Sequence, residues 1–154
     1  MKILLENVNL QSSSGPNSFA NKLVPSLKGL GCEFVQNQED CEVSLCFIQS
    51  FENIKKPRIQ RLDGIYFNVE QDYKQLNQQI QKTYNNSTAV IYQSDFNKRL
   101  VERYFGTHSR STVIHNGADL RQISKTTPMK NEKYDNIWCC ASSWRPHKRL
   151  QENI

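Results

Sequence analysis

Arg61 and Asp63 stand two residues apart at the end of residues 58–62, and Asp63-Gly64 is a turn signal. Because side chains alternate along a strand, we expect both on one face, where the guanidinium orients the carboxylate and keeps it ionised. Such a pair can bind sugar hydroxyls or position an acceptor nucleophile. It can equally be a salt bridge that stabilises a tight turn.

A loop of small residues, 12–17, follows the first apolar run and precedes a helical pattern. Strand, loop and helix in this order present free backbone N–H groups to an anion or a sugar hydroxyl. The loop has neither a GxGxxG pattern nor the lysine of a P-loop, so we do not expect a dinucleotide or ATP site. Gly15 and Asn17 are its candidate ligand-binding residues, and a plain connector is the alternative interpretation.

Arg145 and Lys148 are three residues apart, after the last apolar run. At a helix start both can converge on a diphosphate, with the helix dipole adding positive potential. Residues 97–154 carry 11 basic and 5 acidic side chains, against 9 and 10 in residues 1–96. This basic third favours an anionic partner. A basic tail or solvated surface without a site is the alternative.

The elements that must position these residues alternate between short apolar runs and amphipathic segments. Gly31 ends the first helical pattern, Ser94 caps the third and Gly106 ends it. The alternation predicts an α/β fold, a Rossmann-like parallel sheet with helices on both faces, with ligands beyond the C-terminal ends of the strands. We expect strands at residues 2–8, 32–35, 43–48, 58–62, 89–92, 112–114 and 136–141, and helices at 19–30, 73–84 and 94–105.

The chain has room for one domain and the start of another. Residues 1–120 form the Rossmann-like domain, 121–135 are polar and aperiodic like a linker, and 136–154 begin a second domain. Five cysteines without disulfide or zinc spacing indicate reduced thiols in the cytoplasm. No companion His or Cys spacing supports a metal site, so His115 is interpreted as structural.

The order of these motifs resembles the start of family 4 glycosyltransferases of the GT-B fold. Residues 89–96 resemble that family's A-D-x-V-I-x-x-S-x-F region, although Ser87-Thr88 replaces its common Asp. Residues 113–119 are similar to V-I-x-N-G-V-D. Residues 143–149 resemble G-R-x-x-x-x-K-G with a shorter spacing and without its Gly, and Arg145 and Lys148 match the Arg and Lys of that element.

The resemblance implies the N-terminal, acceptor-side half of an enzyme that transfers a sugar from a nucleotide-sugar donor to an acceptor hydroxyl. Arg145 and Lys148 would stabilise the leaving diphosphate without a metal or other cofactor. Gly15 and Asn17 would line the cleft, with Arg61 and Asp63 on the side of an unknown glycan, lipid or protein acceptor. The family's paired glutamates have no counterpart here, so catalytic residues are unassigned and this chain alone is expected to be inactive.

Two other classes of function stay open. The chain can be a non-catalytic module that binds an acceptor or a partner and pairs in trans with a separate donor-binding subunit, which an apolar surface around Trp138 and Trp144 would favour. Nucleic-acid binding is disfavoured because no aromatic–basic interleaving or reading motif occurs. A cytoplasmic location is expected, with peripheral association with a membrane surface as a variant.

Overall fold

The computed structural model describes residues 1–12, 14–118, 120–127, 133 and 151. The chain divides into two compact units, Met1–Gly117 and Ala118–Ile154. The first unit contains the sheet and the candidate site. The strand expected at residues 136–141 lies outside the described residues, as do Trp138, Trp144, Cys139 and Cys140.

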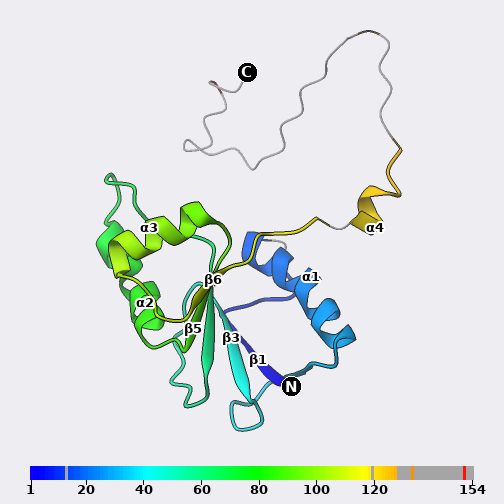
Figure 1. The fold of residues 1–154 in the computed structure, drawn as a ribbon, viewed down its shortest axis with the longest axis horizontal. Helices are drawn as coiled ribbons and strands as arrows, with labels where there is room; N and C mark the ends of the chain where they lie inside the picture. The colour runs from blue at the N-terminus through cyan, green and yellow to red at the C-terminus, as the bar shows by residue number, and fades with distance from the viewer. Residues whose placement is uncertain (13, 119, 128–132, 134–150, 152–154) are drawn as a thin grey trace. The chain divides into compact units, whose positions relative to one another are not determined.

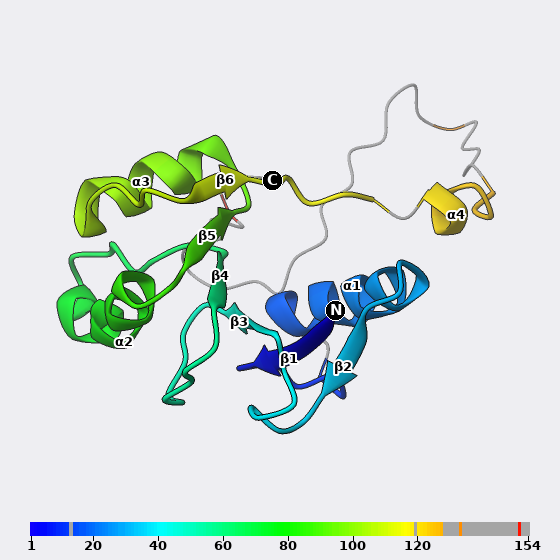
Figure 2. The same cartoon turned by 60° about the horizontal axis from the view of Figure 1, so that its bottom comes forward.

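Six parallel strands form one sheet in the order β2-β1-β3-β4-β5-β6 (Figure 2). The direction of strand addition reverses between β1 and β3, which are neighbours in the sheet. Loops that follow these two strands therefore diverge at the carboxyl edge, the usual place for ligands in such sheets. The strands are β1 (Lys2–Glu6), β2 (Glu33–Val35), β3 (Val43–Phe47), β4 (Arg58–Leu62), β5 (Ala89–Tyr92) and β6 (Ser111–Val113).

Helix α1 (Gly15–Gly29) lies on one face of the sheet, and α2 (Tyr73–Asn85) and α3 (Asp95–Phe105) lie on the other (Figure 1). This confirms the predicted α/β fold with a Rossmann-like parallel sheet and helices on both faces. A short helix, α4 (Leu120–Ile123), belongs to the second unit and overlaps the start of the segment interpreted as a linker. The linker assignment stays a prediction.

Each face of the sheet has its own apolar core. On the α1 face, Ile3, Leu45 and Phe47 pack against Ala20 and the apolar side of α1. The core on the α2 and α3 face contains Leu62, Val90 and Tyr92 from the strands, Ile80 and Tyr84 from α2, and Val101 from α3. Burial of these side chains supplies most of the driving force that holds the helices on the sheet.

The helix ends follow local signals, with one correction. Ser94 caps α3 through its Oγ, which accepts from the Asn97 N–H at 3.1 Å, and Gly106 ends the helix with a φ of 88°. Helix α1 begins at Gly15, before the expected start at Phe19, so Gly15 and Asn17 lie in its first turn rather than in a loop. Pro16, near the helix start, needs no backbone hydrogen-bond donor there. Strand β6 begins and ends one residue earlier than expected.

The described cysteines are free thiols: Cys32, Cys41 and Cys46. Within the same part of the chain, no helix is both long and apolar enough to cross a bilayer. Cys46 lies on β3 with no solvent exposure. Burial, and secondarily the negative charge of Glu6, raise the pKa of its thiol from about 9 to about 12, while Arg58 opposes the shift.

The raised pKa of Cys46 predicts a loss of stability at alkaline pH. An unfolded thiol ionises near pH 9, whereas the folded one stays protonated until about pH 12. The contribution of the protonated Cys46 thiol to the free energy of unfolding is therefore complete below about pH 9. Above that pH, the free energy of unfolding falls by up to ~1.4 kcal/mol per pH unit. Urea unfolding between about pH 8 and about pH 10.5 should show a shallower decline for Cys46→Ala than for wild type.

The matched control is Val43→Ala on the same strand, which removes no titrating group and should keep the wild-type slope. Identical slopes for Cys46→Ala and wild type would contradict the assignment of the alkaline loss to Cys46. A lower stability of Cys46→Ala at all pH values is expected from the small cavity alone, so only the slope is diagnostic.

Candidate functional site

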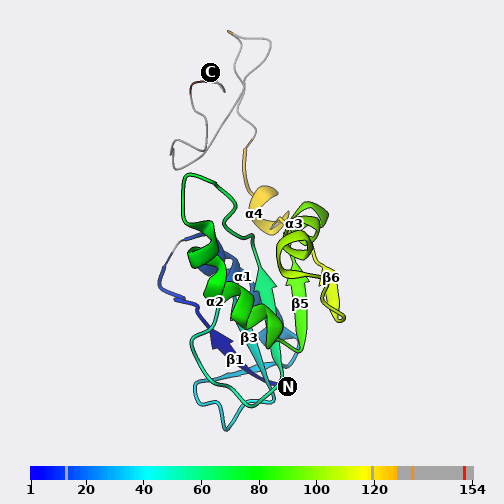
Figure 3. The ribbon, with the colours of Figure 1, turned by 90° about the vertical axis from the view of Figure 1, so that its left-hand side faces the viewer.

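Four polar side chains meet at the carboxyl edge of the sheet, and we name them the Arg61 cluster. Arg61 is the penultimate residue of β4 and Asp63 follows its end, while Gln93 directly follows β5 and Asn116 lies beyond β6. Because β4, β5 and β6 are parallel neighbours, their carboxyl ends converge at this edge. Figure 3 shows the loop that leads from β4 into α2 extending beyond the arrowheads of the strands.

The cluster is joined by a closed ring of hydrogen bonds. Arg61 Nη1 forms an ion pair with Asp63 Oδ1, and Arg61 Nη2 donates to Asn116 Oδ1 at 2.8 Å. Asn116 Nδ2 donates to Gln93 Oε1 at 3.2 Å, and Gln93 Nε2 donates to the main-chain oxygen of Asp63. The predicted contact of Arg61 with Asp63 is confirmed, and the ring fixes the ends of three strands relative to one another.

Arg61 is buried on the α1 side of the sheet, with an exposure of 4%. Its guanidinium carbon lies 3.8 Å from the centre of the Phe19 ring and 5.6 Å from that of Phe47. These distances allow cation–π attraction, which is stronger for a desolvated cation. Burial lowers the pKa of the Arg61 guanidinium and raises the pKa of the Asp63 carboxyl, while the attraction between the two groups opposes both shifts.

Buried amides hold the segment around Asp63 in place. With its amide oriented to satisfy both neighbours, Asn97 on α3 donates to Leu62 O at 2.9 Å and accepts from Gly64 N–H at 3.3 Å. Asn77 on α2 accepts from the Tyr66 N–H at 2.9 Å and donates to Tyr66 O at 2.6 Å. Helices α2 and α3, which lie on the face opposite α1, therefore both restrain the backbone that carries Asp63.

One carboxylate oxygen of the cluster is available to a ligand. Asp63 Oδ1 is bound by Arg61, and no described residue forms a hydrogen bond with Oδ2. The Asp63 side chain is 25% exposed, and Asn116 beside it is exposed. A carboxylate oriented by an arginine next to an amide can accept a hydrogen bond from a hydroxyl or an N–H group.

The other predicted site residues have separate positions. Asn17 Oδ1 accepts from the Asn9 N–H at 3.0 Å and so fixes the loop before α1, while Gly15 is exposed at the helix start. In the described part of the chain neither bonds to the Arg61 cluster; the contact from α1 comes from Phe19 instead. Arg145 and Lys148 lie outside the described residues.

Sequence reasoning did not assign Gln93, Asn116 or Phe19 to the site. For Gln93 and Asn116 the position in the sequence is a signal that could have found them. Gln93 directly follows a strand and Asn116 closely follows one, at the same edge of the sheet as Arg61. His115, the neighbour of Asn116, has its Nε2 atom 4.0 Å from Asp95 Oδ2, and both side chains are more than two thirds exposed. Among the described residues, no group of three or more His, Cys, Asp or Glu side chains is arranged to hold a metal ion.

No protein-family model, curated protein or solved structure matches this chain. Its function therefore has to be inferred from the chemistry of the Arg61 cluster and from the motifs in the sequence.

Proposed function

We propose that the chain is the acceptor-side domain of a nucleotide-sugar-dependent glycosyltransferase, and that the Arg61 cluster binds an acceptor hydroxyl. The observation that carries the proposal is the Asp63 carboxylate at the carboxyl edge, which Arg61 holds through Oδ1, while no described residue bonds to Oδ2 and the side chain is 25% exposed. The order of glycosyltransferase-like motifs along the chain supports it.

A hydroxyl group suits this cluster because it can donate to Asp63 Oδ2 and accept from an amide. The ion pair with Arg61 keeps the carboxylate oriented, and the amide ring keeps Asn116 beside it. A fixed acceptor oxygen reacts faster than a freely moving one once a donor is bound. Under this proposal Asp63 and Asn116 position the acceptor and do not by themselves supply the transfer.

The donor would be held elsewhere in this proposal. Arg145 and Lys148 would contact its diphosphate, and a donor-binding half would act in cis or as a separate subunit in trans. We place the activity in the cytoplasm, consistent with the free thiols of Cys32, Cys41 and Cys46. The nucleotide sugar is a substrate, so no further cofactor is required.

The proposal predicts weak sugar binding at the Arg61 cluster. We would titrate the ¹⁵N-labelled chain with methyl glycosides of glucose, galactose, mannose and N-acetylglucosamine and follow amide shifts by NMR. At least one glycoside should shift the amides of residues 63, 93 and 116. Asn116→Ala should weaken that binding about 2- to 10-fold, as expected for one lost hydrogen bond.

His115→Ala is the matched control, because it changes the adjacent exposed side chain and leaves the ring of hydrogen bonds intact. Equal losses in both variants, or glycoside shifts confined to other residues, would argue against an acceptor site at the cluster. The chain alone should also release no nucleoside diphosphate from UDP-glucose or GDP-mannose. Turnover of either donor would overturn the assignment as an acceptor-side domain only.

A further inference from the structure

On part of the sheet, loops stand in the place of the helices that usually connect parallel strands. Residues 36–42 connect β2 to β3, and residues 48–57 connect β3 to β4, and neither connection contains a helix. Parallel strands are more often joined by a helical crossover of a dozen or more residues. On the face opposite α1, the described residues of these connections therefore leave part of β1 open.

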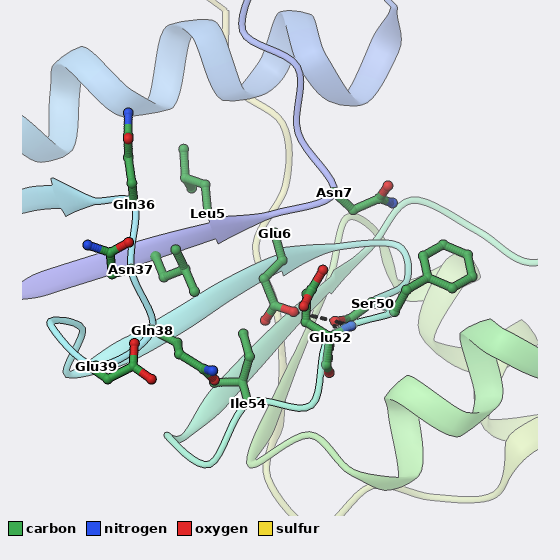
Figure 4. Close-up of a pocket in the computed structure, with 12 residues that line it drawn as sticks. Leu5, Glu6, Asn7, Gln36, Asn37, Gln38, Glu39, Ser50, Glu52 and Ile54 are labelled. Carbon is green, nitrogen blue, oxygen red and sulfur yellow. Dashed lines mark hydrogen bonds between the residues drawn. The ribbon is translucent and has the colours of Figure 1, made fainter.

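A pocket of about 600 Å³ lies between these two connections and β1 (Figure 4). Residues 36–39 line one side of the pocket, Ser50 and Glu52 lie on the other side of Glu6, and Phe51 and Ile54 also line it. This volume is within the range of small-molecule sites. The pocket is separate from the Arg61 cluster, because none of the four cluster residues lines it.

The floor of the pocket is a preformed polar network. Arg58 Nε donates to Glu6 Oε1 at 2.9 Å, and Arg58 Nη2 donates to Glu6 Oε2 at 3.0 Å. Ser50 Oγ donates to the same carboxylate, and Arg58 Nη2 also donates to Glu52 O at 2.9 Å. Arg58 neutralises Glu6 and fixes the wall formed by Ser50 and Glu52, so the pocket does not have to form when a ligand binds.

The lining selects for a hydrophilic ligand. Gln36, Asn37 and Gln38 line one side of the pocket, and the Gln38 carboxamide, which points into it in Figure 4, offers both a donor and an acceptor, the pairing that hydroxyl groups need. Phe51 also lines the pocket, is 73% exposed and can pack against the C–H surface of a ring. Most small-molecule sites are lined mainly by apolar side chains, and this one is not.

The charge of the residues that line the pocket favours a cationic ligand over an anionic one. Glu39 and Glu52 are exposed carboxylates, whereas no Lys, Arg or His is among the described residues that line the pocket. Because Arg58 beneath the floor is paired with Glu6, the pocket keeps a net negative charge. A negative pocket repels phosphates and other anions and attracts ammonium groups.

We propose that this pocket binds a small polyhydroxylated ligand that carries an amino group, of the size and chemistry of an amino sugar. The hydroxyl groups are bound by the carboxamide of Gln38, the ammonium group by Glu39 and Glu52, and the ring packs against Phe51. The proposal does not depend on the function proposed for the Arg61 cluster, because it uses different residues.

Three matched probes test the proposal: glucosamine, glucose and glucose 6-phosphate, titrated by NMR into the ¹⁵N-labelled chain at about pH 6.5. Glucosamine should shift the amides of residues 36–39 and 50–54 with saturation. Glucose should shift the same amides with a Kd about 2- to 10-fold higher, since it lacks the attraction of the two exposed carboxylates. Glucose 6-phosphate should produce no shifts there. Ethylamine, which lacks hydroxyl groups, should bind more weakly than glucosamine.

Single substitutions separate the binding of the ammonium group from the packing of the sugar ring. Glu39→Gln should raise the Kd for glucosamine about 2- to 5-fold and leave the Kd for glucose unchanged. Phe51→Ala should weaken both sugars, and Glu33→Gln, an exposed glutamate outside the pocket, should weaken neither. Equal binding of glucosamine and glucose 6-phosphate, or shifts confined to residues that do not line the pocket, would overturn the proposal. These residues and those of the Arg61 cluster give separate signals, so each proposal can fail alone.

Discussion

Replacement of Arg58 by methionine should lower the free energy of unfolding by about 3–5 kcal/mol, because it leaves the Glu6 carboxylate buried without a counter-charge. The exposed fractions of the two side chains are 9% for Arg58 and 3% for Glu6, so water solvates neither charge well. Arg58 also donates to Ser50 Oγ at 3.1 Å. Urea unfolding of the purified chain, monitored by circular dichroism, measures the loss.

The double variant Glu6→Leu with Arg58→Met provides the internal test. Removal of both charges leaves no buried ion, so the double variant should be more stable than Arg58→Met alone, although Ser50 and the Glu52 carbonyl lose a donor. Arg99→Met, at an exposed position of α3, should change the free energy of unfolding by less than about 0.5 kcal/mol. Additive losses in the double variant would show that the pair does not act as a unit. If Arg58→Met does not fold at all, the result still agrees with the prediction, provided that the double variant folds.

Much of the fold could be predicted because its elements carry local signals. Strand β5 and the helices α2 and α3 were expected within a residue of where they lie, since period and capping are properties of neighbouring residues. Strand β4 carried a weaker signal. It lies inside the sheet and yet buries Arg58, Gln60 and Arg61. Their partners, such as Glu6 and the Ile48 carbonyl, come from other strands or loops, so the sequence alone does not show how these polar groups are satisfied.

The same distinction applies to the site. Arg61 and Asp63 are two residues apart, and strand alternation alone predicts their contact. The bond between Arg61 and Asn116 joins residues 55 apart, and the bond from Gln93 to Asp63 joins residues 30 apart. Both depend on the order of β4, β5 and β6, which periodicity does not determine. The open pocket could not be predicted either, because it results from two connections that lack a helix.

The Arg61 cluster should respond asymmetrically when its two charges are removed one at a time. Asp63→Asn keeps the shape of the side chain but leaves Arg61, with an exposure of 4%, without a counter-charge, and should cost about 3–5 kcal/mol in the free energy of unfolding. Arg61→Met should cost less, about 1–2 kcal/mol, because methionine packs well on aromatic rings such as those of Phe19 and Phe47. Water can also solvate the Asp63 side chain, which is 25% exposed.

The direction of the pKa shift of Arg61 supports this order. Its pKa is lowered by burial even with Asp63 present, so the protein already disfavours the charged guanidinium, and loss of Asp63 increases that cost. Asp95→Asn, the same substitution at an exposed position on this edge, should cost less than about 1 kcal/mol. Urea unfolding of the three variants tests the order. A larger loss for Arg61→Met than for Asp63→Asn would mean that Arg61 acts mainly through its contacts with Phe19, Phe47 and Asn116, and that the ion pair is not what holds Asp63 for a ligand.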